Sequence, residues 1–388
     1  MKTIKNVFIN LTITAAAVYL PLLAFSTYSE ILRKNTSKAR IERINKKRIP
    51  AIKNGYLPFY IPSEIKSKVK KTGFYPIGSL PFTKTYYCDE GYGLIKYITD
   101  RFGLRNKDEV WVNIKNQPNI FLIGDSFGQG ACVPSQNTIT SNIKESTNIN
   151  SINLASSANS PYEYHAILKT ILNPILLEKS FKNWVILLFY NNDDILHNQD
   201  DFNKLNSAKS IIFENNNGNI SPKESYIKEL SNIIKTNYPT SQNEIINKLQ
   251  NKYGYGISKK NLKESFLYKV LTLVPIRSSL YKLKSLFERK ISPTEKSIAY
   301  LAETCKENCT PIVAYIPSHR NKDPYLDPLR YKKLLREFSL KYKIKFIDSE
   351  GLINPNSSID YSPEGAHLSI VGYRKIGNLI SDAIKSEK

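Results

Sequence analysis

The sequence predicts an α/β protein in which helices cover both faces of a central parallel sheet, a three-layer α/β/α arrangement. Short apolar runs with the length of buried strands recur along the chain, and longer segments with helical periodicity separate them. Strands that alternate with helices usually pair in parallel, because each helix carries the chain back across the sheet. The predicted strands are 119–123, 150–154, 184–190, 311–316 and 343–347.

An apolar run near the start of the chain predicts a membrane anchor over residues 1–30. No charged residue lies between Lys5 and Glu30, and the run Val7–Phe25 is long enough for a transmembrane helix. Polar residues dilute this run, and Ala24–Ser26 resembles a signal-peptide cleavage site. A cleaved signal and a buried core helix are therefore the two alternatives.

The remaining chain divides into two regions. Residues 31–118 form a basic connector and a lead-in segment, and residues 119–388 form the α/β domain. Polar loops interrupt the strand–helix pattern at about 197–295, which predicts a helical insertion. Within it, residues 262–290 are basic and amphipathic. We expect this segment to cap a cleft, with attachment to a membrane surface as the alternative.

The segment FLIGDSFGQGACV, residues 121–133, places a serine where a strand ends and a helix begins. Functional residues collect at the carboxyl ends of parallel strands, and the first N–H groups of a helix stabilise developing negative charge. Ser126 is therefore predicted to be a nucleophile, provided that a base lies within reach. The structural alternative for Ser126 is a helix N-cap.

The candidate base is His367, which lies in the sequence DYSPEGAHLSIVGY shortly before a predicted C-terminal helix. Glu364, three residues earlier, can accept the Nδ1–H of this histidine and leave Nε2 for Ser126. Asp360 is the alternative acid. His319 follows another predicted strand, and we expect a structural or substrate-contacting role for it.

These motifs resemble the SGNH (GDSL-type) hydrolase superfamily, which has a GDS serine and a C-terminal Asp-x-x-His. The sequences CDEGYG (88–93) and ITDRFGLRN (98–106) resemble a membrane-anchored bacterial subgroup associated with cell-surface polysaccharide. The resemblance extends over about 83–384 and implies a flavodoxin-like sheet and a domain outside the cytoplasmic membrane. Basic residues after the anchor favour the opposite orientation by the positive-inside rule, but large domains translocate largely regardless of charge.

The resemblance also implies an oxyanion hole with three donors. The first is the backbone N–H of Ser126. The second is expected at Ala158, where the family has a glycine, and the third is an asparagine side chain after strand 184–190. Asn192 is the predicted residue and Asp193 the alternative, although an ionised aspartate would repel an oxyanion.

Four cysteines are present, and an even number is typical of an oxidising compartment. Cys88 and Cys132 lie in two of the family-like sequences, so they are the disulfide candidates, and their pairing would fasten the lead-in beside Ser126. Cys305 and Cys309 are four residues apart. Their spacings do not match a zinc site. No motif predicts a metal or a cofactor.

The chain has 56 lysines and arginines against 34 acidic residues, a formal net charge of +22. The basic residues are spread along the chain without a compact stripe beyond the connector, so nucleic-acid binding is not predicted. The prediction is a serine-dependent ester hydrolase or O-acyl(acetyl)transferase that acts on an acylated carbohydrate or cell-surface polysaccharide. The alternative is a catalytically inactive, membrane-anchored glycan-binding or assembly protein of the same fold. The sequence does not predict an oligomeric state.

Overall fold

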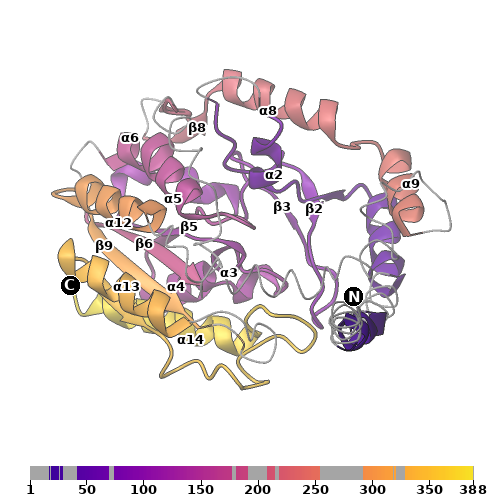
Figure 1. The fold of residues 1–388 in the computed structure, drawn as a ribbon. Coiled ribbons are helices and arrows are strands. Elements are labelled where there is room, and N and C mark those ends of the chain that lie inside the picture. Colours follow the sequence, from indigo (N-terminus) through magenta and orange to yellow (C-terminus); the bar gives the residue numbers. More distant parts are fainter. Residues whose placement is uncertain are drawn as a thin grey trace, which may run out of the picture. The chain divides into compact units, whose positions relative to one another are not determined.

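The structure is a computed structural model. It describes residues 17, 19–25, 27–28, 42–69, 74–176, 181–190, 208–214, 218–253, 292–317, 319 and 328–387. The chain divides into two compact units, residues 1–49 with 245–289 and residues 50–244 with 290–388. Figure 1 shows the chain as a ribbon with helices and strands labelled. Every predicted site residue that the structure describes lies in the second unit.

A five-stranded parallel sheet forms the centre of the second unit, which confirms the predicted fold class. Its order is β10-β9-β6-β4-β5. In chain order, the second strand lies on one side of the first and the remaining strands on the other. This reversal places a topological switch point beside β4, where ligands usually bind in open α/β sheets. The strands are β4 (Asn119–Ile123), β5 (Asn150–Asn153), β6 (Asn183–Tyr190), β9 (Thr310–Ile316) and β10 (Lys345–Asp348).

Helices cover both faces of this sheet, and the side chains of β4 alternate between two hydrophobic clusters. Ile120 and Leu122 pack into one cluster, and Phe121 and Ile123 pack into the other. This alternation is the period of two expected for a strand buried on both faces. The first cluster includes α4 (Ile139–Thr147) and α14 (Ile370–Lys385); the second includes α5 (Pro161–Ile167), α12 (Ser292–Cys305) and α13 (Pro328–Lys341).

The lead-in is part of the same compact unit as the parallel sheet. Its own three-stranded sheet has the order β1-β2-β3, with β1 and β2 parallel and β3 antiparallel to β2. Trp111 and Phe102 of the lead-in belong to the same cluster as Phe121 of β4. The elements are β1 (Leu57–Pro58), α2 (Pro62–Lys66), β2 (Lys84–Tyr86), β3 (Lys96–Ile98) and the short 3-10 turns Asp108–Trp111 and Ile114–Asn116. A further 3-10 turn, Ser135–Asn137, precedes α4 in the α/β domain.

The predicted insertion is described in part. It contains a two-stranded antiparallel sheet and two helices: β7 (Ile212–Glu214), β8 (Ile220–Pro222), α8 (Glu224–Asn237) and α9 (Gln242–Tyr253). After α5 the chain continues through a π-helical turn (Leu168–Leu172) into α6 (Asn173–Leu176). The amphipathic segment 262–290 lies outside the described residues, as does most of the predicted anchor at 1–30. No helix in the described part of the chain has both the length and the apolar character needed to cross a membrane.

Candidate active site

Ser126 is the first residue of the short helix α3 (Ser126–Gln129), which directly follows β4 and Gly124. All residues of β4 are buried, whereas Ser126 is partly exposed. The buried strand therefore holds Ser126 in place while its hydroxyl remains accessible to a substrate. The N-cap of α3 is Asp125, whose carboxylate accepts a hydrogen bond from the N–H of Phe127 at 2.8 Å. The N-cap alternative for Ser126 is therefore wrong.

Two glycines allow this turn to lie close to its neighbours. A Cβ at Gly128 would lie 2.6 Å from the Cβ of Ala155, in the segment after β5. Gly130 ends α3 with a φ of +77°, where glycine carries no steric cost, and a Cβ there would lie 2.5 Å from Thr138. Larger residues at these positions would force α3 away from the sheet, which explains the glycines of GDSFGQG.

His367 lies in the turn before α14, and the structure brings it to Ser126 across 241 positions of sequence. Its carbonyl accepts a hydrogen bond from the N–H of Ser362 at 2.8 Å, and Ser369 begins α14 as its N-cap. The imidazole ring packs against Phe127, with ring centroids 4.9 Å apart. His367 Nε2 lies 2.9 Å from Ser126 Oγ. This distance allows direct proton transfer from the hydroxyl.

The carboxylate on the other side of the imidazole belongs to Glu90 of the lead-in. Glu90 Oε1 lies 2.9 Å from His367 Nδ1, and Glu90 Oε2 accepts the backbone N–H of His367 at 3.1 Å. Burial raises the pKa of Glu90, but the hydrogen bonds and charge of His367 and a hydrogen bond from Ser362 outweigh it, so the pKa lies below its ordinary value. An ionised Glu90 favours the Nδ1–H tautomer and leaves Nε2 free to face Ser126.

The prediction that Glu364 orients His367 is wrong, and so is the alternative, Asp360. Glu364 contacts Glu90 through its backbone, donating its N–H to the Glu90 carbonyl at 3.2 Å. Asp360 is buried beside α14 and pairs with Lys375 at 2.8 Å. Gly365 provides the room for Glu90, since a Cβ at Gly365 would lie 1.6 Å from the Glu90 carboxylate carbon. The turn that carries His367 is therefore shaped to accept an acid from elsewhere in the chain.

Cys88 and Cys132 form the disulfide that the sequence resemblance predicts. This bond joins the segment that carries Glu90 to the segment that follows α3, and Cys132 Sγ lies 3.8 Å from His367 Nδ1. Glu90 is only two residues from Cys88. The predicted pairing was thus the one sequence signal that could have placed Glu90 beside the nucleophile. Cys305 and Cys309 form a second disulfide at the end of α12.

Among the described residues, one group of His, Cys and carboxylate side chains is close enough together to hold a metal ion. It consists of Glu90, Cys132 and His367, whose potential ligand atoms lie within 4.8 Å of one another. Cys132 Sγ is bonded to Cys88, so it does not offer the thiolate that a metal binds. Glu90 and His367 already bond to each other. The donor set therefore fits a hydrogen-bonded catalytic pair better than a metal site.

The backbone of Ala158 has a φ of +56°, in the left-handed region that favours glycine. Alanine thus adopts the angles expected at the family's glycine position. The segment runs beside β4, because Ser156 N–H and Asn159 Nδ2 both donate to the carbonyl of Gly124, at 3.2 and 3.3 Å. Within the described residues, neither the Ser126 N–H nor the Ala158 N–H donates a hydrogen bond. Neither donor is therefore used by the described part of the chain.

The lead-in also contacts this loop. Tyr87, next to Cys88, donates its hydroxyl to Ser157 Oγ at 2.5 Å. Burial raises the pKa of Tyr87 to about 12, so the phenol keeps its proton at neutral pH. Tyr87 therefore fixes the residue before Ala158 by a hydrogen bond.

The third predicted donor, Asn192 or its alternative Asp193, lies outside the described residues. The strand before it, β6, ends at Tyr190, whose ring stacks on Phe127 at 3.7 Å. The chain thus leaves the described strand next to α3. His319 is buried against Tyr361, with ring centroids 4.8 Å apart.

The chain is similar to several solved structures, although no family model and no curated protein matches it. One is a member of the lipolytic protein G-D-S-L family from Veillonella parvula (13% identity, TM-score 0.35), which covers 69% of this chain and 98% of that one. A protein assigned to the same family from Desulfitobacterium hafniense has 12% identity and a TM-score of 0.33, over 68% and 98%. A protein assigned to the SGNH hydrolases from Slackia heliotrinireducens has 10% identity and a TM-score of 0.35, over 69% and 100%.

Removing the disulfide between Cys88 and Cys132 by serine substitution of both residues should lower kcat on an ester substrate by about 10- to 100-fold, because Glu90 and the segment after α3 lose their covalent connection. The matched control is the double serine variant of Cys305 and Cys309, which removes a disulfide at the end of α12. We expect the control to keep its kcat. Equal kcat in both variants, measured with folded protein, would show that the first disulfide does not position the site.

Proposed function

We propose that the chain is a serine-dependent ester hydrolase or O-acyltransferase of the SGNH (GDSL-type) superfamily. The observation that supports this most directly is the continuous hydrogen-bonded line from Ser126 Oγ through the His367 ring to Glu90, with 2.9 Å at both contacts. A nucleophile bonded to a base, which is itself bonded to an orienting carboxylate, is the arrangement of a serine triad. The site lies after the carboxyl end of β4, at the switch point of the sheet.

In this mechanism Ser126 Oγ attacks the acyl carbonyl while His367 Nε2 takes the hydroxyl proton. Glu90 holds the imidazole and stabilises the imidazolium that forms. The N–H groups of Ser126 and Ala158 bind the oxyanion of the tetrahedral intermediate. His367 then returns the proton to the leaving alcohol, and an acyl-enzyme on Ser126 remains. Water as the second acceptor makes the protein an esterase, and a sugar hydroxyl makes it an O-acyltransferase.

The proposed substrate is an acylated carbohydrate or cell-surface polysaccharide, and the proposed location is the outer side of the bacterial cytoplasmic membrane, with an N-terminal anchor. The location is supported by cysteine chemistry, since all four cysteines are paired in disulfides. Structural disulfides persist in oxidising compartments and are rare in the cytosol. The substrate class is supported by the sequence motifs that resemble the polysaccharide-associated subgroup.

Labelling with a fluorophosphonate probe tests the proposed chemistry. We expect the probe to modify the purified protein once per chain, on Ser126, because the probe forms a stable adduct only with an activated serine. Ser126→Ala should abolish labelling. Ser141→Ala, which removes another partly exposed serine, should label like the parent. A folded parent protein that does not react would favour the alternative function, an inactive glycan-binding protein of the same fold.

A further inference from the structure

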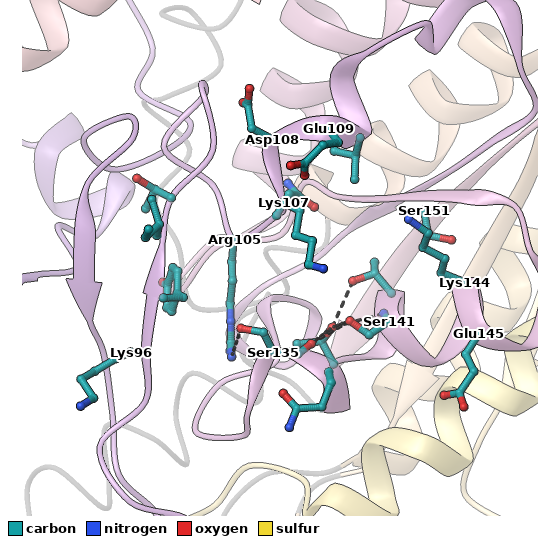
Figure 2. Close-up of a pocket in the computed structure, with 18 of the residues that line it drawn as sticks. Lys96, Arg105, Lys107, Asp108, Glu109, Ser135, Ser141, Lys144, Glu145 and Ser151 are labelled. Carbon is teal, nitrogen blue, oxygen red and sulfur yellow. Dashed lines mark hydrogen bonds between the residues drawn. The ribbon is translucent and has the colours of Figure 1, made fainter.

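A cavity lies beside the edge strand β5 of the parallel sheet, apart from the triad. Its volume is about 1000 Å³, and neither Ser126, Glu90 nor His367 lines it. Its walls are β3 of the lead-in, the segment 105–110, and the first turns of α4 (Figure 2). The catalytic site described above does not account for this space.

Four cations line the cavity, Lys96, Arg105, Lys107 and Lys144, and none of them forms a salt bridge among the residues that the structure describes. Lys107 and Lys144 are exposed and make no salt bridge within the described part of the chain. Figure 2 shows Lys107 extending from the same segment as Arg105, with Ser141 and Lys144 across from it on α4. Free ammonium groups on opposite walls of one cavity favour a negatively charged occupant.

Arg105 adds a buried positive charge to the cavity wall. The residue is only 5% exposed, and its guanidinium donates to the backbone carbonyls of Gly130 and Val133 and to Ser135 Oγ. Arg105 forms no salt bridge among the described residues, and its Nε has no hydrogen-bond partner there. A buried charge without a carboxylate partner is costly, and an anion bound in the cavity would offset that cost.

Apolar side chains are exposed on the same wall. Phe82 is 62% exposed and Ile98 is 57% exposed, and both line the cavity. Phe82 also has a φ of +49°, in a region that is strained for residues other than glycine. Such strain in non-glycine residues is concentrated at ligand-binding sites. An exposed aromatic ring beside cations and hydroxyl groups matches the mixed apolar and polar surface of a sugar ring.

We propose that this cavity binds an acidic polysaccharide segment, independently of the acyl-transfer site. Carboxylates among the lining residues support a sugar over a polyphosphate. Glu109 and Glu145 would repel closely spaced phosphates but can accept hydrogen bonds from sugar hydroxyls. The hydroxyls of Thr140, Ser141 and Ser151 provide further polar contacts. That the bound polymer is also the ester substrate rests on the proposed function above.

Binding of an oligogalacturonate, a linear polyuronate, to the full chain tests this proposal by calorimetry at low salt. We expect saturable binding that weakens about tenfold in Lys107→Glu/Lys144→Glu, because two attractive charges become repulsive. Phe82→Ala should weaken binding severalfold without changing the salt dependence. Lys84→Glu/Lys115→Glu is the matched control. It makes the same charge change outside the cavity and should bind like the parent.

All these variants should react with fluorophosphonate like the parent, since none of the replaced residues belongs to the triad. Unchanged affinity in the cavity variants would overturn the proposal, as would equal binding of a neutral maltooligosaccharide or of single-stranded DNA. If a protein that fluorophosphonate labels does not bind oligogalacturonate, the cavity proposal fails and the proposed esterase function is unaffected. If the protein binds oligogalacturonate but is not labelled, the proposed esterase function fails and the cavity proposal is supported.

Discussion

Replacing Glu90 with glutamine should lower kcat/KM on an ester substrate by about 10⁴-fold, the scale seen when a triad carboxylate becomes an amide. Glutamine keeps the size of the side chain but can donate a hydrogen bond to His367 Nδ1, which favours the tautomer with its proton on Nε2. That proton would face Ser126 Oγ, so the imidazole could no longer accept the serine proton. Steady-state rates with p-nitrophenyl acetate measure the effect.

The matched control is Glu364→Gln, which makes the same chemical change on the carboxylate that the sequence favoured. Because Glu364 contacts Glu90 through its backbone N–H, we expect kcat/KM within about twofold of the parent. The pH profile adds a readout that misfolding would not produce. The Glu90→Gln variant should regain part of its activity at high pH, where hydroxide can replace the lost base. A large effect of Glu364→Gln with little effect of Glu90→Gln would contradict the assignment.

Replacing Lys66 with methionine should lower the free energy of unfolding by about 3–5 kcal/mol, because it leaves a buried carboxylate without its cation. Lys66 Nζ lies 2.6 Å from Glu163 Oε1, and the Glu163 side chain is 4% exposed. Glu163 also accepts hydrogen bonds from Tyr75 and from the N–H of Ser160. Burial raises the pKa of Glu163, but the charge of Lys66 and these hydrogen bonds keep the pKa below its ordinary value.

The loss should depend on pH with a definite sign. In the parent protein the folded pKa of Glu163 is depressed, so its contribution is present above the unfolded value of 4.5 and is lost as the pH falls through the folded pKa. Without Lys66, burial dominates and the folded pKa rises, so the variant loses stability as the pH increases. Urea unfolding should therefore show a larger difference between variant and parent at about pH 7 than at about pH 5.

Lys228→Met is the control for this prediction. Lys228 pairs with Glu224 four residues earlier on α8, but both side chains are highly exposed, at 75% and 82%. Exposed pairs contribute little to stability, because solvent already screens both charges. We expect no measurable change in the urea midpoint. If Lys66→Met and Lys228→Met lower the free energy of unfolding equally, the burial of Glu163 does not determine the size of the stability loss.

The sheet was predictable because each of its strands is a local signal. The strand β4 is buried throughout, and after Asn119 its residues 120–123 are all apolar. Pro118 and Gly124 bound it. Parallel strands that helices cover on both faces can be recognised from their local apolar pattern, even when the strands that pair with them are not known. Ser126 followed from the same signal, since a Gly-Asp-Ser sequence after a buried strand places the serine at the sheet edge.

The acid was not predictable from spacing, because its position depends on contacts distant in sequence. Glu90 bonds to His367 although 277 positions separate them in the sequence. The disulfide of Cys88 holds the Glu90 segment in place, and Gly365 leaves space for the Glu90 carboxylate. Glu364 is close to His367 in the sequence and has the spacing expected of an orienting acid, so the sequence favours it over Glu90. No periodicity or motif spacing encodes how the lead-in folds against α3.

The place of Glu90 in the chain limits how this protein can be shortened or rearranged. A fragment that begins at β4 would keep the whole parallel sheet, the nucleophile and the base, yet it would lack the carboxylate that orients the base. Trimming to the recognisable α/β layer would therefore yield a protein with an incomplete site. A shortened form that keeps both Glu90 and its neighbouring disulfide, as the proposed mechanism requires, must start ahead of Cys88.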